Sequence, residues 1–257
     1  MMQDFRSQAE KIRDRRIGLR AEEVAAWYFR LNGFLSLPGF IVHLDQDKAD
    51  VSENGIPRYQ RTEADLIGVR FIQSIEIINA FGNKRAMIDD SRLTELCKPS
   101  DTKQALFVLV EVKAGICKMN GPWTNKRKEN MQRVIRRLGF ALDEMHVEKI
   151  AAEMYDNGRY EDDFYVLQYI CIGSAKSSDI KNKYNNVVQI DWVEIGEFLI
   201  DRFISFPEKT PDGQVHEQWP EFGRKFGKWI SDKKISSSHL DIKPSSLISF
   251  IRTGEFI

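Results

Sequence analysis

The chain alternates between stretches whose apolar residues recur at helical spacing and stretches that are apolar throughout. In AEEVAAWYFRLNGF the apolar residues repeat every three to four positions, which predicts one helix from about Ser7 to Asn32, with Gly33 as its stop. The run ALFVLVEVKAG at 105–115 has no helical period, so it predicts a strand that is buried on both faces. Further strands are predicted in GFIVHL, TEADLIGVRF, FYVLQYICIG and NVVQI.

Helical spacing returns in the second half of the chain. It predicts helices at about 124–140 and 142–155, an amphipathic helix with Asp191 as its N-cap, and two short tail helices in WPEFGRKFGKWISDKK and SSLISFIRTG. Between 72 and 104 the pattern is mixed, with IEIINAF as a strand, DDSRLTELC as a short helix and KPSD as a turn, while DQDKADVSENGIPRYQ predicts a polar loop or hairpin tip. This order of elements indicates a mixed α/β fold in which helices flank a sheet.

Length and hydrophobic content define the broad class of protein. A chain of 257 residues, 42% of them hydrophobic, can bury a core over most of its length, which excludes general disorder. We expect residues 1–175 to form the main domain, with an insertion at about 72–104, and residues 176–257 to form an α-rich extension packed on it. No apolar run reaches the roughly 18 to 20 residues that span a bilayer, and no signal-peptide pattern opens the sequence, so we expect a cytoplasmic protein without a membrane partner.

Charge and cysteine content exclude several classes of function. The 38 basic residues are balanced by 38 acidic ones, so the chain as a whole is not a polybasic nucleic-acid coat. Cys97, Cys117 and Cys171 contain no close pair, which predicts small buried hydrophobes rather than disulfides or zinc ligands. The four histidines show no metal-ligand spacing, and the absence of a glycine-rich phosphate loop excludes a P-loop nucleoside triphosphatase.

The strongest candidate for chemistry is Glu111-Val112-Lys113, at the end of the buried strand predicted at 105–115. The two-residue period of a strand places Glu111 and Lys113 on one face and Val112 on the other. A carboxylate and an ammonium group at the edge of a core are costly unless they are paired or given a ligand. A simple salt bridge at the strand end is the alternative interpretation.

Asp65 supplies a second carboxylate, and the apolar residues of its segment begin directly after it, so we expect Asp65 to open a strand. If that strand neighbours the strand of Glu111, the two carboxylates converge on one divalent cation, because hard oxygen ligands suit Mg²⁺ or Mn²⁺. Lys113 would then lie beside the metal, where it could orient or deprotonate a water for attack on a phosphorus. The alternative is that Asp65 only caps a turn.

The first predicted helix carries Glu22 and Glu23 beside an apolar stretch. One of them facing inward would supply another metal ligand or hold a metal-bound water. Otherwise both are solvated acids, and this is what we expect for Glu23.

These residues, in this order, resemble the PD-(D/E)xK nuclease superfamily. The nearest pattern is its Holliday-junction-resolvase-like branch, in which a helix G-E-x-x-A-x-x-Y/F-L-x-x-x-G precedes strands of the form G-E-x-D-L-I and F-V-E-V-K. The matching stretches here are EEVAAWYFRLNG at 22–33, EADLI at 63–67 and VLVEVK at 108–113. Position 21 is Ala where that branch has Gly, about 30 residues are inserted between the two strands, and the chain beyond about residue 173 has no counterpart.

The resemblance implies a restriction-endonuclease-like fold, here with a helical C-terminal extension, and a metal-dependent endonuclease acting on DNA in preference to RNA. Carried over by position, Asp65 and Glu111 would bind Mg²⁺ or Mn²⁺, and the backbone carbonyl of Val112 would complete the metal site. Lys113 would be the catalytic lysine, and Glu22 the helix carboxylate that assists it.

A basic segment follows the candidate site. Residues 113–137 carry a net charge of +7, and cationic side chains supply most of the sequence-independent affinity for nucleic acid. The candidate contacts are Lys118, Lys126, Arg127, Lys128, Arg133, Arg136 and Arg137. A solvated helix face is the alternative. We expect the acidic stretch at 143–163 to face away from the substrate.

Several polar and aromatic residues have a simpler structural interpretation. We expect Asn130 and Gln132 to be surface amides and Trp123 to pack its loop against the core rather than stack on a base. The aromatic residues at 219, 222, 226 and 229 form one helical stripe, which favours core packing or a dimer contact.

Two other functions fit the same residues. One is a non-catalytic nucleic-acid-binding module, and the other is a subunit of a restriction or defence complex that needs a partner protein bound through the C-terminal third. Cutting of two strands with one site per chain would favour a homodimer.

Overall fold

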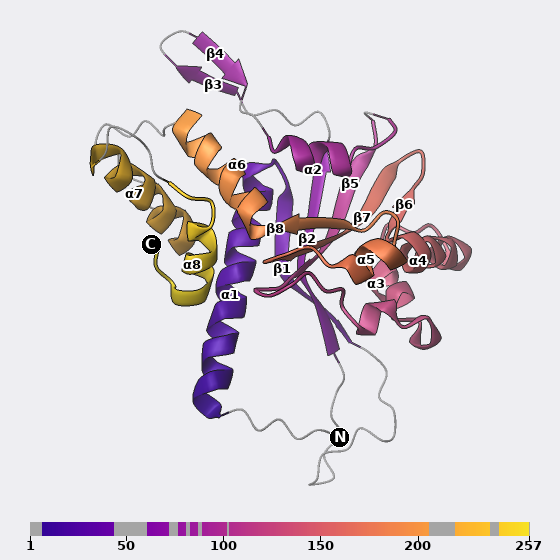
Figure 1. Ribbon diagram of the computed structural model, residues 1–257. Coiled ribbons are helices and arrows are strands. Elements are labelled where there is room, and N and C mark those ends of the chain that lie inside the picture. Colours follow the sequence, from indigo (N-terminus) through magenta and orange to yellow (C-terminus); the bar gives the residue numbers. More distant parts are fainter. Residues whose placement is uncertain are drawn as a thin grey trace.

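The computed structural model describes residues 7–43, 61–71, 77–80, 83–86, 89–101, 103–205, 219–236 and 242–256. Its centre is a six-stranded sheet in the order β1-β2-β5-β7-β6, with β8 also paired to β7 (Figure 1). The strands are β1 (Leu35–His43), β2 (Arg61–Phe71), β5 (Ala105–Val112), β6 (Arg159–Glu161), β7 (Tyr165–Gly173) and β8 (Val188–Asp191). The loop predicted at DQDKADVSENGIPRYQ lies outside the described residues.

The sheet is mixed. β1, β2 and β5 are antiparallel neighbours, whereas β5 pairs in parallel with β7, and β7 with β8. A parallel pair requires a crossover connection, and the chain between β5 and β7 supplies it with α3 (Asn130–Leu138) and α4 (Glu144–Asn157). The expected mixed α/β architecture is therefore confirmed.

Helices cover both faces of the sheet. Alternate residues of β5 belong to different cores: Val108 and Val110 pack with one set of helices, and Leu109 packs with α3 and α4. The first set comprises α1 (Gln8–Leu31), α6 (Trp192–Ser205), α7 (Glu221–Ser236) and α8 (Ser246–Thr253). The short helix α5 (Ser178–Lys183) precedes β8.

Helix ends follow local capping signals. Ser7 and Glu10 form a capping box at the start of α1, and Asn32 is its C-cap, so the bounds predicted for this helix are confirmed. The helix predicted from 124 begins instead at Asn130, because Glu129 adopts a left-handed conformation with φ 52°. Two 3₁₀ turns, η1 (Pro122–Thr124) and η2 (Lys126–Lys128), precede it.

The predicted insertion contains a β3–β4 hairpin (Ile77–Ala80 and Asn83–Ala86) and the short helix α2 (Ser91–Leu96). The hairpin forms a separate two-stranded sheet that stands away from the main one (Figure 1). Residues 72–76, 81–82, 87–88 and 102 lie outside the described part.

The C-terminal segment is continuous with the main core. The strand β8 belongs to the central sheet, so the sheet extends past residue 175. Trp27 of α1 lies against aromatic rings of the segment from α6 to α7, namely Phe203, Trp219, Phe222 and Phe226. The predicted aromatic stripe is therefore used for core packing. No described helix is long and apolar enough to cross a membrane.

Candidate active site

The register of β2 and β5 brings the two predicted acids together. Leu66 pairs with Val110, so Asp65, which precedes Leu66, faces Glu111, which follows Val110. Asp65 lies inside β2, which begins four residues earlier at Arg61, and the expectation that Asp65 opens the strand is wrong. The backbone N–H of Val112 donates to Asp65 Oδ2 at 2.6 Å, so this carboxylate joins β2 to the end of β5 rather than capping a turn.

Lys113 contacts both acids. Its Nζ lies 2.5 Å from Glu111 Oε1 and 3.6 Å from Asp65 Oδ2. Burial lowers the pKa of Lys113, but attraction to Glu111 and Asp65 outweighs burial, and the pKa is raised. Lys113 is therefore an ammonium ion in this geometry, suited to orienting a ligand and stabilising negative charge.

Glu111 is the most constrained of these acids. Its side chain is buried, with a residue exposure of 4%, and burial together with the charge of Asp65 raises its pKa to about 7. Its Oε2 atom has no hydrogen-bond partner. A buried carboxylate oxygen without a donor is costly, and a bound cation would offset that cost.

Glu22 reaches the same place from α1. Burial, followed by the charges of Asp65 and Glu63, raises its pKa to about 7, while Lys113 acts in the opposite direction. All four positions predicted from the sequence as catalytic therefore lie in one electrostatically coupled group. Glu23, expected to be a solvated acid, instead accepts a 2.9 Å hydrogen bond from the backbone N–H of Phe222 at the start of α7.

Asn120 is a site residue that the sequence does not reveal. Its side chain donates to the backbone oxygen of Glu63 at 3.1 Å and forms a hydrogen bond that lowers the pKa of Glu111. Its backbone N–H donates to the hydroxyl of Tyr169 at 3.0 Å. Asn120 thus fastens the loop after β5 to β2. No spacing signal marks it, because the contact depends on how the loop folds back over the strand ends.

The donor set limits how a metal could bind. Among the described residues, no group of three or more His, Cys, Asp and Glu side chains could hold a metal ion. The N–H of Val112 donates to Asp65, and the N–H and C=O of one residue in an extended strand point to the same side, so the Val112 carbonyl is directed toward the β2 side of β5. Two carboxylates and one carbonyl, completed by waters, form an oxygen set that suits Mg²⁺, which usually keeps several waters.

The predicted basic segment is partly neutralised by its neighbour. Lys126 pairs with Asp156, and Arg136 pairs with Glu144 at 2.6 Å, both acids belonging to α4. Part of the acidic segment at 143–163 thus lies against the basic segment, because α4 packs directly on α3, while its orientation relative to a substrate stays a prediction. The guanidinium of Arg137 lies over the ring of Phe40, 5.5 Å from its centroid. Arg133 is half-buried, and the other cations are exposed: Lys118, Arg127 and Lys128.

Three neighbouring side chains stabilise the structure from inside. Asn130 and Gln132 are buried, contrary to expectation: Asn130 donates to the carbonyl of Pro122 at 2.7 Å, and Gln132 accepts from Tyr155 at 3.0 Å. Trp123 is fully buried beside Tyr169, so it packs its loop on the core and does not present a face to a base.

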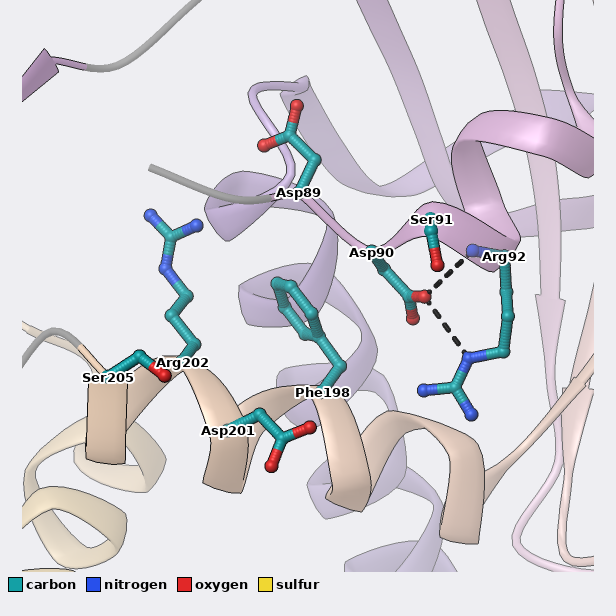
Figure 2. A pocket seen from close by; sticks show the side chains of 8 residues that line it. All are labelled: Asp89, Asp90, Ser91, Arg92, Phe198, Asp201, Arg202 and Ser205. Carbon is teal, nitrogen blue, oxygen red and sulfur yellow. Dashed lines mark hydrogen bonds and ion pairs between the residues drawn. The ribbon is translucent and has the colours of Figure 1, made fainter. Parts of the chain in front are cut away.

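A separate cavity of about 290 Å³ lies between α2 and α6 (Figure 2). Asp90 at its wall accepts from the hydroxyl of Tyr28 at 2.8 Å and from the backbone and side chain of Arg92. The backbone N–H of Asp90 donates to Asn32 at the end of α1. These bonds fasten the insertion to the core at the end of α1 remote from Glu22, so the cavity is not part of the candidate site.

No protein-family model, curated protein or solved structure matches this chain.

Proposed function

We propose that this chain is a divalent-metal-dependent nuclease of the PD-(D/E)xK superfamily, with a restriction-endonuclease-like core, that hydrolyses phosphodiester bonds in DNA. The proposal depends on one observation: Asp65 within β2 and Glu111 at the end of β5 meet side by side, with Lys113 in contact with both. The donorless Oε2 of buried Glu111 supports a cation as the missing partner.

The roles of the residues follow from this geometry. Asp65, Glu111 and the Val112 carbonyl would hold Mg²⁺ or Mn²⁺, which would neutralise charge on the phosphate oxygens and acidify the attacking water. Lys113, kept protonated by its two acidic neighbours, would orient the water and stabilise charge that develops at phosphorus. Glu22, with its raised pKa of about 7, is suited to accept a proton near neutral pH.

Cleavage of supercoiled plasmid, linear duplex, single-stranded DNA, branched DNA and RNA would be compared in Mg²⁺, Mn²⁺ and EDTA. We expect metal-dependent cleavage of DNA that falls by at least about 100-fold in Asp65→Asn and in Lys113→Ala. Asn keeps an oxygen that can accept from the Val112 N–H, so this variant separates loss of charge from loss of folding. Lys98→Ala is the matched control, because Lys98 is an exposed lysine outside the site.

Cleavage that survives both site variants would refute the proposed site. A folded protein that binds duplex DNA but cuts none of these substrates would instead favour the non-catalytic binding module. Activity that appears only with a second protein would favour the partner-dependent subunit.

A further inference from the structure

The N-terminal half of α1 is helical without being packed on the rest of the molecule. Every residue from Ser7 to Arg16 is exposed, whereas the buried residues of α1 begin at Ala21. In Figure 1 this half of the helix extends well beyond α8 and the other helices of its layer. An isolated helix of this length is marginal in water, so these turns depend on the capping box and on continuity with the buried half of α1.

The direction of α1 places this exposed half next to the candidate site. Phe34, just after α1, contacts β2 at Gly68, while Glu22 lies within electrostatic reach of Glu63 and Asp65. From its C-terminal end to its N-terminal end, α1 therefore runs along β2 in the direction of Arg61, the first residue of that strand. Residues 8–16 then lie farther along this direction than Glu22, past the level of the site residues.

One face of this exposed half is basic and continuous with the site. Positions four and seven residues apart lie on one face of a helix, so Lys11 and Arg15 share the face of Glu22. Gly18 lies on this face between Arg15 and Glu22. A Cβ at Gly18 would meet nothing within 4 Å, so no tertiary contact requires a glycine there. The missing side chain leaves this face open between Arg15 and Glu22.

Two cations of this arm, Arg15 and Arg16, are not used by the described part of the fold. Among the described residues, no carboxylate forms an ion pair with Arg15 or Arg16. Arg20, by contrast, is used structurally, because it donates to the carbonyls of Ile251 and Arg252 at the end of α8, each at 2.8 Å.

We propose that residues 8–16 of α1 form a substrate-binding arm, in which Lys11 and Arg15 contact the phosphate backbone of duplex DNA beside the phosphate held at the site. This inference rests on the proposed function and deepens it. The rise of a helix places Arg15 about 10 Å and Lys11 about 16 Å from the level of Glu22. At 3.4 Å per base pair, these distances correspond to contacts about three to five base pairs from the cleaved phosphate.

The test compares two double variants that remove the same charge from the same arm. Lys11→Gln/Arg15→Gln removes two charges from the face of α1 that carries Glu22, and Arg13→Gln/Arg16→Gln removes two charges from the other faces of this helix. Affinity for a fluorescent duplex of about 30 base pairs would be measured in EDTA over a series of salt concentrations. We expect Lys11→Gln/Arg15→Gln to weaken binding at least about tenfold and to reduce the slope of log affinity against log salt by about 1.8. We expect Arg13→Gln/Arg16→Gln to weaken binding less than about threefold.

Equal losses in both double variants would overturn the assignment to one face, and no loss in Lys11→Gln/Arg15→Gln would overturn the arm. Exposed Ile12 and Leu19 beside this face fit a second copy of the chain as a competing occupant. The proposal would therefore also be overturned by two results together: the wild type is a dimer that Ile12→Gln/Leu19→Gln dissociates, and Lys11→Gln/Arg15→Gln leaves the affinity for DNA unchanged. Because binding is measured without metal, loss of the arm is distinguishable from failure of the nuclease hypothesis, which affects cleavage alone.

Discussion

Single residues at the candidate site are explained by strand geometry and burial. Glu111 and Lys113 meet because two positions along a strand share a face, and Asp65 joins them because its strand is the neighbour of β5. Glu111 is then buried beside a second carboxylate, which the ammonium group of Lys113 offsets only in part. Such an arrangement costs stability unless a ligand is bound, and this is typical of a functional site rather than of a structural salt bridge.

The raised pKa values give a pH dependence with a definite sign. Glu111 and Glu22 have pKa values of about 7 in the folded protein, against 4.5 for an ordinary glutamate. Between these values the folded state binds more protons than the unfolded state, so stability falls as pH rises from about 5 to 7. In EDTA we expect the free energy of unfolding to be lower at pH 8 than at pH 5, by roughly 1 to 3 kcal/mol from Glu111.

Urea unfolding at several pH values in EDTA measures this dependence. Glu111→Gln should reduce the slope, and Glu22→Gln/Glu111→Gln should largely abolish it, with the exposed Glu95→Gln as the control for loss of a carboxylate. Stability that rises from pH 5 to pH 8, or a slope unchanged in both site variants, would contradict the pKa assignments.

At the scale of elements, α1 has two functions in one helix. Its C-terminal half is a core helix whose Trp27, Tyr28 and Phe29 are buried, and its N-terminal half is exposed and charged. The capping box stabilises the exposed start, and Arg20 ties the middle of the helix to the end of α8. The same helix therefore provides Glu22 and an exposed helical extension beside it.

Two helical glycines should respond oppositely to the same substitution. Gly18→Ala adds a methyl group where nothing lies within 4 Å, so helix propensity should stabilise the protein by about 0.5 to 1 kcal/mol. Gly196→Ala in α6 places Cβ 2.6 Å from the carbonyl oxygen of Pro244, so overpacking should destabilise it by about 1 to 3 kcal/mol. Thermal unfolding of both variants checks the contrast, and a Gly196→Ala protein as stable as the wild type would refute the close approach of α6 to the segment before α8.

At the scale of the whole molecule, the two ends of the chain form one core. Trp27 of α1 and Phe250 of α8 both pack on Phe222 of α7, so the C-terminal helices cover the first helix. The backbone N–H of Phe222 also donates a hydrogen bond to the carboxylate of Glu23, which reinforces the contact between α1 and α7 directly beside Glu22. The position of the site residue on α1 thus depends on chain segments about 200 residues away.

Removing this contact should therefore destabilise the entire protein. We expect Phe222→Ala to lower the free energy of unfolding by about 3 to 5 kcal/mol, because Phe222 is fully buried among aromatic rings. Phe164→Ala is the matched control, since Phe164 is 74% exposed and its loss should change stability by less than about 0.5 kcal/mol. Unfolding followed by tryptophan fluorescence and by far-ultraviolet circular dichroism should coincide. Separate transitions would show that α7 and α8 unfold independently of the sheet.

The sequence by itself determined the elements and the chemical character of the site. Periodicity located α1, β5 and β7 closely, and the E-V-K segment was identified by the abrupt appearance of charge after a buried strand. These features are local, because the spacing of apolar residues along a helix, or their continuous run in a buried strand, can be read within a short window of the sequence.

Only the tertiary structure decided which residues meet. The role of Asn120, the use of Glu23 to cap α7 and the pairing of Lys126 and Arg136 with acids of α4 all join segments that no sequence spacing relates. The exposure of the basic face of Lys11 and Arg15 likewise depends on which parts of α1 other elements cover. Contacts of this kind follow from strand order and helix packing, which fix the neighbours of a side chain across the whole molecule.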